Sequence, residues 1–136
     1  MSGPQLAVGA VAVVDDQLLL VRRGHGPGAG RWSIPGGRVE TDEPVAAAVI
    51  REVGEETGLD VVVDDLLGWA ERFDEGHHFV ILDFAVTVLD TDITPRPGDD
   101  AAEAAWVPLA DLGDYQLVDG LTEFLDDAGV LDPAEG

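Results

Sequence analysis

Residues 37–59 read GRVETDEPVAAAVIREVGEETGL, and this stretch contains the clearest helical pattern in the chain. The spacing of its apolar residues predicts a helix over residues 43–57. The apolar face expected for this helix consists of Ala46, Ala47, Ile50 and Val53. Thr41 or Asp42 is expected to cap its first turn, and Gly58 is expected to end it.

Strands are predicted on both sides of this helix. Apolar or β-branched runs that predict strands lie at residues 6–14, 17–22, 32–34, 59–63, 67–73, 78–89 and 104–107. Asp15 and Asp16 are expected to form the turn of a hairpin. A helical turn over residues 108–112 and an amphipathic helix over 117–128 complete the pattern. Strands before and after a long helix predict a single α/β domain over residues 1–136, with a mixed sheet between helical layers.

The composition limits the function classes. The chain carries 28 acidic and 7 basic residues, for a net charge of −21. A field of this sign repels phosphate backbones, so binding to a nucleic acid polymer is not expected. Cysteine is absent, which excludes cysteine nucleophiles and thiolate metal sites. No apolar run is long enough to span a bilayer and no signal-peptide pattern opens the chain, so a cytoplasmic location without membrane contact is predicted.

Three glutamates share one face of the predicted helix. Glu52, Glu55 and Glu56 are spaced i, i+3 and i+4. Glu52 and Glu56 form a like-charge pair that destabilises an isolated helix by about 0.2–0.5 kcal/mol, and the helix dipole disfavours anions at this end. A bound divalent cation would reverse both effects, and carboxylate oxygens suit Mg²⁺ or Mn²⁺. The alternative is a solvated acidic face in a very acidic protein.

The residues around these glutamates resemble the Nudix box, G-x5-E-x7-R-E-U-x-E-E-x-G-U, in which U is a bulky aliphatic residue. Every specified position is satisfied, by Gly37, Glu43, Arg51, Glu52, Val53, Glu55, Glu56, Gly58 and Leu59. So many fixed residues at fixed spacings form a far more specific signal than a lone glycine-rich loop. The resemblance to the Nudix, or MutT-like, hydrolases implies an α/β/α sandwich with a mixed central sheet.

The resemblance assigns roles to the matching positions. It implies that Glu52, Glu55 and Glu56 bind the metal, with the carbonyl of Gly36 or Gly37 completing the shell. The remaining box residues Gly37, Glu43, Arg51 and Gly58 are expected to brace the motif. Arg51 can also pair with Glu55 one helical turn further on.

The implied reaction is attack by water on phosphorus, with a carboxylate removing the proton. The candidate catalytic residues are Glu52, Glu55 and Glu103. Glu52 and Glu103 are the two candidate bases, because some family members place a base or a further ligand before the last strand. The alternative for Glu103 is a solvated loop acid.

Phosphate contacts are expected from arginines near the glycine-rich loop. Arg22 and Arg23 end a predicted strand, at a position where an arginine of similar proteins contacts phosphate. Because side chains alternate along a strand, only one of the two should face the site, and Arg23 is favoured. Gly37 and Arg38 are further candidates for substrate contact.

The resemblance leaves the substrate open. A small-molecule nucleotide is expected, with ADP-ribose or a nucleotide sugar favoured. The first alternative is a (d)NTP pyrophosphatase, such as an enzyme that removes 8-oxo-dGTP. A second alternative, of another class, is a Nudix module that senses a nucleotide without cutting it. A homodimer is possible, because many similar proteins pair through the sheet or its edges.

Overall fold

The computed structural model describes residues 3–24, 29–74, 76–98 and 101–131. The strands are β1 (Gln5–Val11), β2 (Val13–Val14), β3 (Gln17–Arg23), β4 (Trp32–Ser33), β5 (Gly36–Arg38), β6 (Val61–Asp74), β7 (His77–Val88) and β8 (Ala101–Pro108). The helices are α1 (Val45–Thr57), the 3-10 helix η1 (Leu109–Asp114) and α2 (Leu121–Asp127). No helix among these described residues has the length and apolarity needed to cross a membrane.

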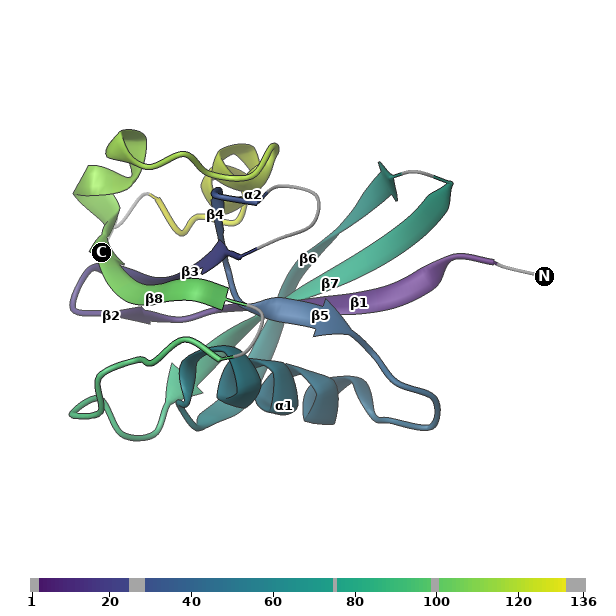
Figure 1. Ribbon diagram of the computed structural model, residues 1–136, viewed down its shortest axis with the longest axis horizontal. Helices are drawn as coiled ribbons and strands as arrows, with labels where there is room; N and C mark the ends of the chain where they lie inside the picture. Colours follow the sequence, from purple (N-terminus) through teal and green to yellow (C-terminus); the bar gives the residue numbers. More distant parts are fainter. Residues whose placement is uncertain (1–2, 25–28, 75, 99–100, 132–136) are drawn as a thin grey trace.

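Two four-stranded sheets form the centre of the molecule. The first has the order β5-β1-β7-β6, and it is mixed because β1 and β7 run parallel while the other pairs are antiparallel. In the second sheet, β3 pairs with β2, β4 and β8, always antiparallel. One apolar core joins α1 to β1, β6 and β7, and the other joins β3 and β8 to η1 and α2. Figure 1 shows α1 on one side of the strands and α2 on the other, so the predicted α/β architecture with a mixed sheet is confirmed.

The box helix differs in two respects from its prediction. Pro44 is the N-cap residue and no side chain caps the first turn, so the capping role predicted for Thr41 or Asp42 is wrong. The buried residues of α1 are Ala48, Val49, Val53 and Thr57. Only Val53 belongs to the predicted apolar face, and Ile50 is 43% exposed. Alanines on both sides of the helix make its apolar face ambiguous in the sequence. In the folded protein, the face that contains Ala48 and Val49 packs against the sheet.

The predicted turn at Asp15–Asp16 is present, with φ of 52° and 63° at the two residues. Two successive positive φ values give the right twist for a tight hairpin, and Asp tolerates this conformation better than most residues. However, the predicted strand over residues 6–14 is divided at Ala12. Its second part pairs with β3, whereas β1 leaves the hairpin to pair with β5 and β7.

Strand β5 is absent from the predicted strands. Gly36 and Gly37 pair with Gly9 and Val8 of β1. A side chain at Gly36 would collide with the carbonyl oxygen of Val8, so glycine permits this close approach. The pairing places the first residues of the box against the mixed sheet, directly beside α1.

Candidate active site

Arg51 is the centre of an ion-pair network on α1. Its Nε and Nη2 donate to the two oxygens of Glu43, at 2.9 and 3.1 Å. Its Nη1 lies 3.0 Å from Glu52 Oε2 and 3.2 Å from Glu55 Oε1, and Nη2 also donates to the carbonyl of Arg38 at 3.0 Å. The hydrogen bonds with Glu43 raise the pKa of Arg51 and lower that of Glu43. The guanidinium therefore fastens both β5 and the loop before α1 to the helix.

Glu52 and Glu56 lie against the glycines of β5. The Glu52 side chain is only 14% exposed, and a Cβ added to Gly37 would overlap its carboxyl group. Burial raises the pKa of Glu52, although Arg51 opposes this change. Glu56 Oε1 accepts a hydrogen bond of 2.9 Å from the backbone N–H of Gly36. The two glycines thus allow carboxylates from α1 to approach the β5 backbone.

The donors of this site have the chemistry that a hard divalent cation requires. Glu52 and Glu56 supply carboxylate oxygens beside Gly37 and Gly36 of β5, and the exposed Glu55 supplies a third carboxylate from the same helix. Within the described part of the chain, no three acidic or histidine side chains converge on one point. Glu52 and Glu55 turn toward Arg51 instead. The residues fit a cation that competes with Arg51 for these two carboxylates.

The two adjacent arginines of β3 have different environments. Arg22 Nε donates to Glu103 Oε1 at 2.8 Å, and the two residues face each other across the β3–β8 pairing. The Glu103 side chain is 55% exposed, so this candidate base is a partly solvated acid that already has a cationic partner. A register shift separates Arg22 from Arg23. Arg23 Nε is buried and donates no hydrogen bond to any described residue.

Two further predicted site residues lie at the edges of the box. Arg38 is exposed at the end of β5, with its guanidinium carbon 5.8 Å from the centre of the Phe79 ring. Gly58 ends α1 with φ of 78°, and its N–H donates to the carbonyl of Gly54. This left-handed conformation is open to glycine at little cost.

Asp83 is a buried acid for which the sequence patterns predicted no role. It lies in β7 between Gly9 of β1 and Gly68 of β6, and it is 6% exposed. Burial raises the pKa of Asp83 to about 6, although the charge of Arg72 opposes the change. A signal was present, because Asp83 is the one charged residue in the apolar run 79–86.

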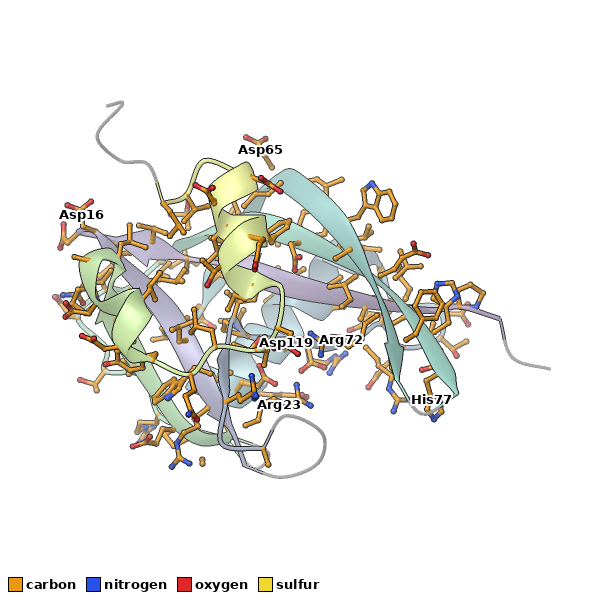
Figure 2. All side chains as sticks on the ribbon, turned by 90° about the horizontal axis from the view of Figure 1, so that it is seen from above. Asp16, Arg23, Asp65, Arg72, His77 and Asp119 are labelled. Atoms are coloured by element: carbon orange, nitrogen blue, oxygen red, sulfur yellow. The ribbon has the colours of Figure 1, made fainter. Side chains whose placement is uncertain are left out.

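Arg23 and Arg72 lie on the same side of the molecule as the start of α2. In Figure 2 their side chains and that of Asp119 project toward the space between α2 and the β6–β7 hairpin. Asp119 is exposed and lies 3.4 Å from Arg31 Nη1. Cationic groups from β3 and β6 therefore flank this space, in a chain that has only 7 basic residues.

Comparison with known proteins places this arrangement in a family. The model of the NUDIX domain matches residues 3–128. This chain belongs to the NUDIX family. The crystal structure of a MutT NUDIX hydrolase from Burkholderia pseudomallei superposes on this NUDIX domain with a TM-score of 0.80, at 30% identity. The match covers 93% of this chain and 98% of that one.

The names of two relatives of this NUDIX domain state a substrate. An ADP-ribose pyrophosphatase from Methanocaldococcus jannaschii is 38% identical over 112 residues, which cover 80% of this chain and 64% of the relative. A human 8-oxo-dGDP phosphatase is 34% identical over 98 residues, which cover 71% of this chain and 30% of the relative. The chain thus spans less than two thirds of either protein.

Proposed function

We propose that this NUDIX domain is a divalent-cation-dependent pyrophosphohydrolase that cuts the diphosphate bond of ADP-ribose or a nucleotide sugar. The observation that carries the proposal is the position of Glu52 and Glu56, which lie against the Gly36–Gly37 strand at one end of α1. Holding like charges together in this way costs free energy unless a cation joins them.

The proposed roles follow from the surroundings of each residue. Glu52, Glu55, Glu56 and the Gly36 carbonyl would hold Mg²⁺ or Mn²⁺. When bound, the cation would neutralise diphosphate oxygens and lower the pKa of a water. Glu52 is the favoured acceptor of the water's proton, because its carboxyl is largely buried against Gly37 of β5. Glu103 is the alternative acceptor, and it would first have to leave Arg22.

Arg23 is proposed to bind a phosphate of the substrate. A buried guanidinium N–H without an acceptor is costly, and an anionic oxygen would satisfy it through a charge-assisted hydrogen bond. Arg22 is less suited to this role because its guanidinium already pairs with Glu103. Gly37 and Arg38 remain candidates for contacts near the reacting phosphates.

The relatives support more than one substrate. The similarity to the ADP-ribose pyrophosphatase from Methanocaldococcus jannaschii supports a diphosphate-linked sugar as the substrate of this chain. The human 8-oxo-dGDP phosphatase supports an oxidised purine nucleotide as the second candidate. A third reading, a nucleotide sensor without turnover, is disfavoured by the complete box. The homodimer and the cytoplasmic location stay predictions.

Product analysis tests the proposal. The protein is incubated with Mg²⁺ and ADP-ribose, a nucleotide sugar, dGTP or 8-oxo-dGTP. AMP and ribose 5-phosphate from ADP-ribose are the expected products. Pyrophosphate from the triphosphates would support the second candidate instead. Binding of these nucleotides without any product would contradict the proposed hydrolase.

Glu56→Gln tests the site itself. Glutamine keeps the oxygen that accepts the Gly36 N–H bond but removes the charge, so turnover should fall at least about 100-fold while the fold persists. Glu123→Gln on the exposed surface of α2 removes the same charge and should leave turnover unchanged. Near wild-type turnover by Glu56→Gln would remove Glu56 from the site.

A further inference from the structure

Asp83 occupies a gap that two neighbouring strands leave open. Gly9 and Gly68 face it from β1 and β6, so neither neighbour carries a side chain beside it. A Cβ added to Gly9 would overlap Asp83 Oδ1 and would also meet Ile34 Cδ1 at 2.9 Å. The carboxyl group therefore lies over the Gly9 backbone, next to Ile34, on the sheet face opposite α1.

The Asp83 carboxyl has no hydrogen-bond donor of its own. It accepts no hydrogen bond from the residues that the structure describes, and its only charged neighbour is Arg72. The residue is 6% exposed, and its oxygens are not among the described buried atoms that lack a partner, so the carboxyl keeps an acceptor that water can reach. A ligand that displaces this water must supply a donor of its own to the carboxyl.

The strand residues beside Asp83 are small or apolar, and the ring of Phe124 lies over Gly68, 3.1 Å from where its Cβ would be. One step along the strands, Ala7 of β1 and Ala70 of β6 flank Ile81 of β7 on the same face. In the next row along the strands, Phe79 of β7 pairs with Arg72 of β6. Two alanines leave the space that larger side chains would fill, so a planar ring can lie over Ile81 with one edge directed at Asp83.

We propose that Asp83 reads the base of the substrate, by accepting a hydrogen bond from the exocyclic amino group of an adenine held against this face. The inference rests on the proposed function, which supplies an adenine nucleotide as substrate. Phosphate is excluded at this position because Asp83 would repel it. A single carboxylate beside an arginine is also a poor site for a cation.

Binding affinities measured by calorimetry test the proposal without requiring turnover. The ligands are AMP and purine riboside 5′-monophosphate, which differs from AMP only in lacking the amino group. The wild-type protein should bind AMP about tenfold more tightly, as one charge-assisted hydrogen bond would give. Asp83→Ala should abolish this preference, and Asp83→Asn should retain part of it because the amide keeps an acceptor oxygen.

A matched variant controls for charge. Asp111→Ala removes an exposed carboxylate of η1 and should leave the preference for AMP intact. Equal binding of the two ligands by the wild type, a preference that survives Asp83→Ala, or no measurable binding of AMP would each overturn the proposal.

The outcome is separable from that of the proposed function. ADP-ribose cleavage without any Asp83-dependent preference would preserve the hydrolase and refute base reading by Asp83. An Asp83-dependent preference for AMP without cleavage of any nucleotide would refute the hydrolase and preserve base reading.

Discussion

The planar guanidinium of Arg51 contacts several groups of the box at once, through nitrogens that point in different directions. It binds Glu43 through two nitrogens and also reaches Glu52, Glu55 and the Arg38 carbonyl. Arg51→Lys keeps the charge but loses this planar geometry, so it should lower the free energy of unfolding by about 1–2 kcal/mol. Urea denaturation measures the change. Unaltered stability in Arg51→Lys would show that charge alone holds the β5–α1 connection.

Asp83 should make the stability of the protein depend on pH. Its folded pKa of about 6 lies above the ordinary value of 3.8, so its contribution to stability is fully present below about pH 4 and is lost as the pH rises through 6. The described groups around it include Gly9 on β1, Gly68 on β6, Ile34 and the ring of Phe124, and the charge that acts on it is that of Arg72.

Asp83→Asn removes this titration. At pH 7.5 the variant should be more stable than the wild type by up to about 3 kcal/mol, since two pH units correspond to nearly that free energy. At pH 4 the two proteins should have similar stability. Thermal melts across this range measure the difference. A constant gap between the two proteins from pH 4 to 7.5 would show that Asp83 does not titrate there.

At the scale of elements, the end of α1 depends on one residue. Gly58 has φ of 78°, and apart from its chain neighbours no described residue has an atom within 4 Å of the Cβ that a substitution would add. Gly58→Ala therefore introduces backbone strain without a clash, and should cost about 1–2 kcal/mol of stability. Gly58→Asn should cost less, because Asn tolerates the left-handed conformation. Equal denaturation midpoints for the two variants would contradict this explanation.

At the scale of the whole molecule, the net charge of −21 dominates the electrostatics. Mg²⁺ should raise the melting temperature in two ways, by general screening and by binding to the box glutamates. Comparison with NaCl at equal ionic strength separates the two. Glu56→Gln should lose the extra increment given by Mg²⁺ and keep the increment given by NaCl. Equal effects of both salts on the wild-type protein would argue against a specific site.

The sequence alone determined the features that depend on neighbours in the chain. The spacing of Glu52, Glu55 and Glu56 follows from helix geometry, and the turn at Asp15–Asp16 follows from local conformational preference. The complete box also identified the family. Each of these features lies within a short stretch of the chain, where conformational propensity and helical periodicity act without help from the rest of the fold.

Only the tertiary structure decided which residues from distant segments meet. It made Gly36 and Gly37 part of an edge strand that was not predicted. It also paired Arg22 with Glu103, and left Arg23 Nε buried without a partner among the described residues. It also buried Asp83 between glycines of two other strands. Strand pairing depends on long-range register and on space left by absent side chains, and no local pattern encodes either of these.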